Sequence, residues 1–143
     1  MGQGGEGSRG AHRITMVDRY AAEVVAAKAV LDEHVRALNA RDEKALVATL
    51  HFPHYRLTGG KMKVWERPDG YLKDFYARAG GDWHHTRWDF KNVIAAGSDK
   101  VHLDVQFTRC RADDSAIGTF RSLWIVSKLD GRWAAHVRSS FAG

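Results

Sequence analysis

Residues 120–133 read FRSLWIVSKLDGRW and contain a β-strand, a turn and the start of a second strand. Bulky aromatic and β-branched residues crowd positions 120–126, as is typical of a strand, and Asp130-Gly131 suits a two-residue hairpin turn. Similar runs precede this hairpin, separated by Gly97-Ser98 and Asp113-Asp114. About the last sixty residues are therefore predicted to form four antiparallel strands.

The three turns predict which strand residues share a face, because side chains alternate along a strand. Counting from each turn gives one apolar face, expected to point inward. Its members are Trp88, Phe90, Asn92, Ile94, Val101, Leu103, Val105, Phe107, Phe120, Ser122, Trp124, Val126, Trp133, Ala135, Val137, Ser139 and Phe141. The opposite face is expected to carry mixed charges, Arg138 included, around an apolar centre of Leu123 and Ile125.

The first half of the chain has the pattern of helices. Residues 1–14 are glycine-rich and are predicted to be a disordered tail, which leaves residues 15–143 as a single domain. Apolar residues then recur at three- and four-residue steps from Val17, so a long helix is predicted to end near Asn39, with Thr15 and Asp18 as its capping pair.

Two shorter helices and a hairpin are predicted between this long helix and the strands. Asp42 is placed to cap a helix that carries Leu46, Val47 and Leu50. Gly59-Gly60 suits the turn of a short hairpin between residues 55–57 and 62–65. Pro68 favours the first turn of a third helix, which Gly80-Gly81 is expected to end.

Composition bounds the kind of protein. The chain has 143 residues, 44% of them hydrophobic and 27% charged, without an apolar run of membrane-spanning length. The net charge of +5 is scattered among 17 acidic residues, so no nucleic-acid partner is predicted. The lone Cys110 and the absence of a secretory signal favour a soluble protein in the cytoplasm.

The predicted inner face combines aromatic side chains with a few polar ones, as small-molecule pockets do. The residues expected to bind a ligand are Thr86, Trp88, Phe107, Arg109, Phe120, Ser122, Ser139 and Phe141. The simpler interpretation is that Ser and Thr are tolerated in strands and that Arg109 ends in water at the rim.

The order of helices and strands resembles the nuclear transport factor 2-like superfamily, including its SnoaL-like members. The motifs that carry the resemblance are LHFPH at 50–54, FRSLWIV at 120–126, DGRW at 130–133 and RSSF at 138–141. The resemblance covers residues 17–142 and implies an α+β cone, in which three N-terminal helices pack on a curved antiparallel sheet. It also implies a pocket that opens beside the third helix.

The resemblance implies acid/base chemistry as one possible activity. Ketosteroid isomerases use carboxylates and a tyrosine; Tyr20 matches the tyrosine, but the expected inner face contains no Asp or Glu. Scytalone dehydratases work with histidines and tyrosines, and His51, His54, His84 and Tyr55 are also expected near the pocket. The candidate catalytic residues are His54, His84 and Tyr20, because histidine exchanges protons near neutral pH.

Other chemistries are less favoured. Arg87, Asp89 and Asp104 resemble the Asp-Arg-Asp arrangement of limonene-epoxide hydrolases, but the predicted register places them on the outer face. His84 and His85 are adjacent and point to opposite faces of a strand, so no metal site is predicted. No glycine-rich phosphate loop follows a strand, so no cofactor is predicted either.

Three functions follow from these patterns. The first is a domain that binds a small organic ligand and acts as an isomerase, cyclase or dehydratase on a cyclic or aromatic compound. The second is a domain that binds such a ligand without catalysis. The third is a dimeric interaction module whose pocket is filled by its own side chains. In each case the outer sheet face suits a homodimer.

Overall fold

The computed structural model describes residues 17–142. The predicted tail, residues 1–14, and Thr15 of the predicted capping pair lie outside the described residues. Within the described part, no helix has the length and the apolar character that a membrane crossing requires.

The long helix is present where the apolar periodicity predicts it. It is α2, Ala21–Asn39, and its end at Asn39 is confirmed. Val24, Ala27, Leu31 and Leu38 are buried along one side of α2, because steps of three and four residues return to the same helical face.

The second helix, α3, spans Glu43–Ala48. Asp42 caps it as predicted, since its Oδ1 accepts a hydrogen bond from the backbone N–H of Ala45 at 3.0 Å. The prediction that this helix includes Leu50 is wrong. Leu50 instead begins the first strand, where it lies opposite Ala135.

The third helix, α4, spans Tyr71–Ala79 and ends at Gly80, as predicted. Gly80 has φ +87°, a backbone angle that glycine adopts without steric penalty. Pro68 lies just before α4, and its carbonyl accepts a hydrogen bond from the N–H of Tyr71 at 3.1 Å.

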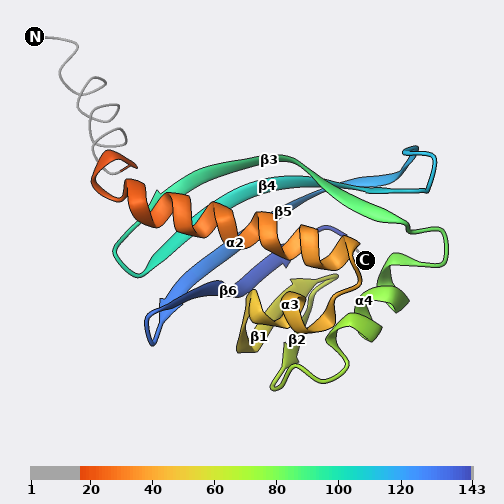
Figure 1. Ribbon diagram of the computed structural model, residues 1–143, viewed down its shortest axis with the longest axis horizontal. Coiled ribbons are helices and arrows are strands. Elements are labelled where there is room, and N and C mark those ends of the chain that lie inside the picture. Colours follow the sequence, from red (N-terminus) through yellow and green to blue (C-terminus); the bar gives the residue numbers. More distant parts are fainter. Residues whose placement is uncertain (1–16, 143) are drawn as a thin grey trace, which may run out of the picture.

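Six strands form one curved, open sheet (Figure 1). They are β1 Leu50–Thr58, β2 Lys61–Trp65, β3 His85–Ala96, β4 Lys100–Cys110, β5 Ala116–Leu129 and β6 Arg132–Ser140. Their order across the sheet is β2-β1-β6-β5-β4-β3, with β1 and β6 parallel and all other neighbours antiparallel. The predicted hairpin at Gly59-Gly60 and the four-stranded meander are both confirmed.

The register between β4 and β5 is confirmed along the predicted inner face. Val101 pairs with Val126 and Phe107 with Phe120. The register between β3 and β4 is confirmed only far from its turn, where Trp88 pairs with Phe107.

Two irregularities in β3 change the faces of its residues nearer that turn. Phe90, predicted to point inward, pairs with Gln106 instead of Val105. Its ring lies beneath the guanidinium group of Arg121, 5.1 Å from the guanidinium carbon. Ile94, also predicted to be inward, is exposed.

The most consequential correction concerns β6. Its pairing with β5 is as predicted up to Ala135 and Val126, and then slips by one residue because His136 is an unpaired β-bulge. The pairs beyond the bulge are Ile125 with Val137, Trp124 with Arg138, Leu123 with Ser139 and Ser122 with Ser140. Arg138 therefore shares the inner face, whereas Phe141 is 83% exposed.

The neighbouring strand β1 supplies a reason for this bulge. Its pairing with β6 is interrupted between Leu50 and Tyr55, at the same level as His136. Two histidines of that segment bond across the irregular region: His54 Nδ1 donates to the Ala135 carbonyl at 3.1 Å, and His51 Nε2 donates to the Ser127 carbonyl at 2.8 Å. The bulge is thus held from outside β6.

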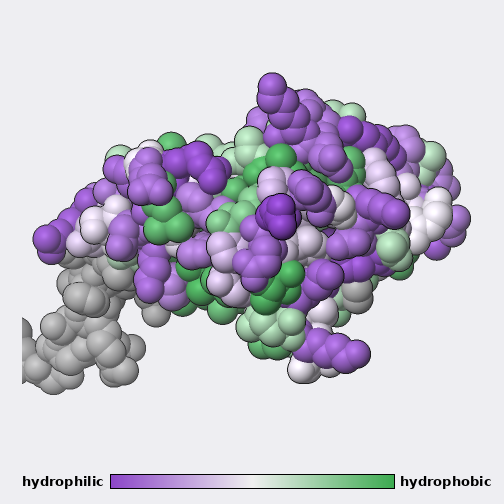
Figure 2. Space-filling view, turned by 90° about the horizontal axis from the view of Figure 1, so that it is seen from below, coloured by the Kyte–Doolittle hydropathy of each residue, from purple (hydrophilic) through white to green (hydrophobic). Residues whose placement is uncertain are grey.

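All three helices lie on the concave side of the sheet (Figure 1), and α2 packs across β3, β4, β5 and β6. The core between them contains the buried face of α2, Tyr71, Leu72 and Phe75 of α4, and the inner residues of the meander. Seen from below (Figure 2), apolar side chains form separate patches among hydrophilic ones.

Candidate functional site

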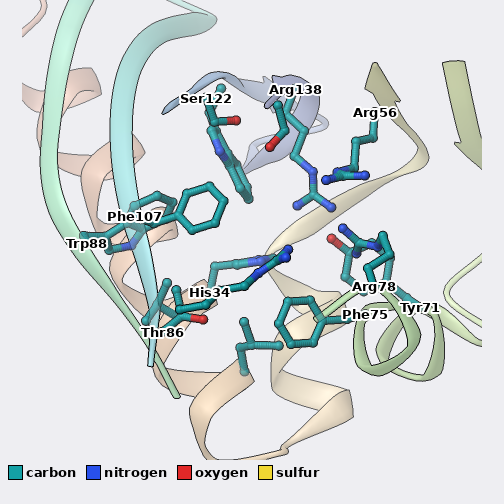
Figure 3. Close-up of a pocket in the computed structure, with 15 residues that line it drawn as sticks. His34, Arg56, Tyr71, Phe75, Arg78, Thr86, Trp88, Phe107, Ser122 and Arg138 are labelled. Atoms are coloured by element: carbon teal, nitrogen blue, oxygen red, sulfur yellow. The ribbon is translucent and has the colours of Figure 1, made fainter. Parts of the chain in front are cut away.

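A small cavity lies between the concave face of the sheet and helices α2 and α4 (Figure 3). Its volume is about 40 Å³, which is room for a few water molecules. Its lining comes from helices and strands alike. The residues are His34, Val35, Leu38, Arg56, Tyr71, Phe75, Arg78, Thr86, Trp88, Phe107, Arg109, Ser122, Trp124, Arg138 and Ser140.

Four arginines reach the cavity from four different elements: Arg56 from β1, Arg78 from α4, Arg109 from β4 and Arg138 from β6. No Asp or Glu is among the described residues that line the cavity. Figure 3 shows the guanidinium groups of Arg56, Arg78 and Arg138 pointing toward one another at one end. Within residues 17–142, these three form no ion pair with a carboxylate.

Backbone and aromatic contacts hold two of these arginines in place. Arg56 Nη2 donates to the carbonyl of Ala142 at 2.7 Å. The guanidinium carbon of Arg138 lies 4.8 Å from the ring centre of Trp124 and 5.7 Å from that of Tyr71. Contacts of this kind offset only part of the free energy of removing a cation from water.

Burial and repulsion by neighbouring arginines disfavour the charged form of Arg56, Arg78 and Arg109. Burial, followed by the neighbouring Arg78 and Arg138, lowers the pKa of Arg56 to about 9. The pKa values of Arg78 and Arg109 are each lowered to about 10, first by burial and then by Arg138. The charge of Arg138 thus contributes to the lowered pKa of each of the other three arginines.

Some of the arginine N–H groups are buried without a hydrogen-bond acceptor among the described residues. These are Nε and Nη2 of Arg78 and Nε of Arg138. A buried donor left without an acceptor costs about 1–3 kcal/mol, and more when it is charged. The site therefore contains donors that an anion would satisfy.

The other end of the cavity is aromatic. The ring centres of Trp88 and Phe107 are 6.0 Å apart, and those of Trp88 and Trp124 are 5.7 Å apart, both in edge contacts. Trp88 Nε1 donates to the carbonyl of Leu31 on α2 at 2.8 Å, which orients its ring. Phe75 adds a further ring to the lining, and its centre lies 5.6 Å from the guanidinium carbon of Arg78.

His34 lines the cavity from α2 and was not among the residues predicted from the sequence. Its Nδ1 lies 2.8 Å from the hydroxyl oxygen of Thr49, which itself donates to the carbonyl of Leu46. Nδ1 must therefore be the donor, which leaves Nε2 with its lone pair. Burial and the charge of Arg138 lower the pKa of His34 well below its usual value, so the ring is neutral.

Five of the residues expected to bind a ligand line the cavity: Thr86, Trp88, Phe107, Arg109 and Ser122. Their pairing partners on β3, β4 and β5 lie where the predicted register sets them.

The remaining three expected ligand residues are not part of the lining. Phe120 lies beside it, with its ring centre 5.3 Å from the guanidinium carbon of Arg109. The inward placement predicted for Ser139 and Phe141 is wrong, because the bulge at His136 turns Arg138 and Ser140 inward instead. Ser139 contributes only its backbone carbonyl, which accepts a hydrogen bond from Ser122 Oγ at 2.7 Å.

The three candidate catalytic residues lie outside the lining of the cavity. His54 is fully buried and bonded to the Ala135 carbonyl, and burial and Arg138 lower its pKa to about 2. His84 is exposed, with its Nδ1 2.9 Å from that of His85. Tyr20 precedes α2 as its N-cap residue.

Arg87, Asp89 and Asp104 also lie away from the cavity lining. Arg87 pairs with Asp89 at 3.3 Å, and Asp104 forms a two-pronged ion pair with Arg121. These are surface ion pairs between neighbouring residues and strands, as expected from the predicted register. Among residues 17–142, no group of three His, Cys, Asp or Glu side chains is placed to hold a metal ion.

Sequence reasoning missed much of the basic end: Arg56, Tyr71, Arg78, Arg138 and Ser140. Arg56 and Arg78 lie outside the four strands whose faces were assigned from the turns. Arg138 follows the unpredicted bulge. In sequence, a buried arginine looks like any surface arginine. The only available signal was the alternation along β1, which puts Arg56 on the same face as the buried His54.

A curved, open sheet, with helices on its concave side and a cavity between the layers, defines the nuclear transport factor 2-like fold, and this chain has it. No protein-family model and no curated protein matches the sequence. The likeness therefore lies in the structure.

Several solved structures share this fold at low sequence identity. A protein of unknown function with a cystatin-like fold from Nostoc punctiforme has a TM-score of 0.70 at 13% identity, covering 86% of this chain and 92% of its own. A nuclear transport factor 2-like protein from Cytophaga hutchinsonii has a TM-score of 0.64 at 15% identity, covering 85% and 98%. A ketosteroid isomerase-like protein from Erwinia carotovora atroseptica has a TM-score of 0.61 at 16% identity, covering 84% and 95%.

Proposed function

We propose that this domain binds a small anionic aromatic molecule in the cavity between its helices and its sheet. The observation that carries the proposal is that Arg56, Arg78 and Arg138 line the cavity and form no ion pair with a carboxylate of residues 17–142. Buried cations are normally paired, so this arrangement favours a partner that arrives from outside the chain. The aromatic wall at the opposite end supports a ring on that partner.

A ligand of this kind needs more room than the 40 Å³ of the cavity, since pockets for organic ligands measure about 300–1,000 Å³. Long arginine side chains can supply that room by changing rotamer. Repulsion among the arginines favours such a movement. If the side chains instead keep their places, the domain is the interaction module that fills its own pocket.

Catalysis as an isomerase, cyclase or dehydratase is a second proposal, in which His54, His84 or Tyr20 carries the proton. Because these residues lie outside the cavity lining, their positions favour ligand binding without catalysis by any of the three. Separate His54→Gln and His84→Gln variants test it against a panel of aromatic acids. If either histidine transfers the proton, its Gln variant should lose activity by about a hundredfold or more and keep its affinity for the ligand.

The binding proposal is tested by quenching of tryptophan fluorescence, because Trp88 and Trp124 line the cavity. The titrant is 1-naphthoate, with neutral 1-naphthalenemethanol as its uncharged counterpart. We expect saturable quenching by the acid only. Arg109→Ala should weaken binding by about 1.5–3 kcal/mol, the contribution of a charged hydrogen bond, whereas Arg121→Ala on the outer face should not. Equal quenching by both compounds would refute an anion site.

A further inference from the structure

The arginine end of the cavity also indicates what charge the ligand carries, an inference that rests on the proposed function. We propose that the ligand's anionic group is a doubly charged oxyanion of the phosphate monoester type, held by Arg56, Arg78 and Arg138. A singly charged carboxylate is the alternative, and it would leave most of the positive charge at this end uncompensated.

Geometry is the first support. The three arginines come from β1, α4 and β6, and their guanidinium groups point toward one another (Figure 3). Arg56 and Arg138 are 3% and 5% exposed, so their charges are held in the interior and not at the rim. A tetrahedral group has oxygens on several sides and suits donors that converge from different directions.

Charge is the second support. Arg138 repels the other three cavity arginines and contributes to the lowering of their pKa values. A phosphate monoester carries a charge of about −1.5 to −2 near neutral pH, against −1 for a carboxylate. The dianion therefore compensates more of the combined charge of Arg56, Arg78 and Arg138.

The number of available donors is the third support. Nε and Nη2 of Arg78 and Nε of Arg138 lack acceptors among the described residues. The ring centre of Tyr71 lies 5.7 Å from the guanidinium carbon of Arg138. Three phosphate oxygens accept more of these hydrogen bonds than two carboxylate oxygens do.

The test compares ligands of matched shape by calorimetric titration at constant ionic strength and pH 7.5. Phenyl phosphate is the dianion, methyl phenyl phosphate is its singly charged counterpart, and benzoate is the carboxylate. We expect phenyl phosphate to bind at least about tenfold more tightly than either, the lower end of the effect of a charged hydrogen bond. Equal binding of phenyl phosphate and methyl phenyl phosphate would overturn the inference.

Variants then locate the group. Arg138→Gln should weaken phenyl phosphate by about tenfold or more and weaken benzoate less, while Arg121→Gln on the outer face leaves both unchanged. If Arg138→Gln does not fold, Arg78→Gln on α4 gives the same comparison. If neither Arg78→Gln nor Arg138→Gln weakens the binding of phenyl phosphate, the anion binds elsewhere and the inference is overturned.

The outcomes separate this inference from the proposed function. Benzoate binding that depends on Arg138, without tighter binding of phenyl phosphate, overturns the dianion and leaves the anionic aromatic ligand in place. No binding of any aromatic anion overturns both. Inorganic phosphate that binds as tightly as phenyl phosphate supports the dianion but contradicts the aromatic part of the proposed function.

Discussion

A slip of one residue in the pairing of β6 places Arg138 in the cavity lining. Its side chain is 5% exposed, it contacts the rings of Trp124 and Tyr71, and its charge acts on the other cavity arginines. Residues that destabilise the unliganded fold are often retained because a functional site needs them. On this interpretation, Arg138 lowers stability and raises affinity for an anion.

The buried histidines predict how stability depends on pH. Burial lowers the pKa of His54 from 6.5 to about 2, so between these values the unfolded chain binds a proton there that the folded chain does not. The stability that neutral His54 contributes is present above pH 6.5 and is lost as pH falls toward 2. The expected slope approaches about 1.4 kcal/mol per pH unit, and His34 adds to it.

Urea unfolding at several pH values between 7.5 and 4.5 measures this slope. In His54→Asn the amide N–H takes the place of Nδ1–H toward Ala135, so the bond is kept and the titration removed. We expect its slope to be smaller by about one proton. His84→Asn, at an exposed histidine, is the control. A slope that is unchanged in His54→Asn would mean that His54 titrates normally in the folded protein.

At the scale of elements, the bulge in β6 and the irregular segment of β1 act as a pair. His51 and His54 both bond backbone carbonyls at this level of the sheet. Bulges of this kind re-aim side chains next to binding sites, and here the bulge exchanges Ser139 and Phe141 for Arg138 and Ser140. His54, a candidate catalytic residue, thus supports together with His51 the backbone that shapes the cavity.

The short helix α3 provides a test of local stability, because a single side chain caps it. Asp42→Ala removes the acceptor of the Ala45 N–H and should cost about 1 kcal/mol. This corresponds to a drop of about 2–4 °C in melting temperature, measured by circular dichroism. Asp42→Ser retains a capping oxygen and should lose little. A drop of similar size in both variants would mean that Asp42 acts by its charge and not as a cap.

At the scale of the whole molecule, the helices cover the concave face of the sheet and leave its outer face for another partner. Leu123 is 37% exposed on that outer face, with the ion pair of Arg121 and Asp104 beside it. The side that Figure 2 shows has only separate apolar patches. An outer face with an apolar centre and charged surroundings suits an isologous dimer, which remains a prediction.

Leu123→Glu tests this dimer by placing two carboxylates, one from each copy, at the expected two-fold centre, where they repel each other. We expect monomers of Leu123→Glu and dimers of the wild type by light scattering at high micromolar concentration. Tyr76→Glu, at an exposed residue of α4, is the matched control and should stay dimeric. A wild type that is monomeric at that concentration would refute the prediction.

The sequence by itself determined the elements and most of the turns. Helical periodicity defines α2, and Asp42 caps α3. Gly59-Gly60 and Asp130-Gly131 define two hairpins. These signals act between residues close in the chain. The same local signals set the β4 and β5 register, and with it the inward positions of Phe107 and Ser122. About half of the cavity lining followed from that register and from the far part of β3.

Only the tertiary structure decided the chemical character of the site. The bulge at His136 depends on contacts with β1, a strand far away in the chain whose Tyr55 pairs with Val137.

 The bond between His54 and the Ala135 carbonyl likewise joins residues 81 positions apart. No local pattern reports such contacts, so counting alternate residues along β6 fails beyond Ala135.

The arginines also come together through contacts between parts of the chain that are distant in sequence. Arg56, Arg78, Arg109 and Arg138 lie on four elements far apart in the chain, and only the packing of α4 and β1 against the meander brings their charges to one cavity. The burial of these arginines is a property of that packing, because a charge is desolvated by all the elements around it and not by its neighbours in sequence.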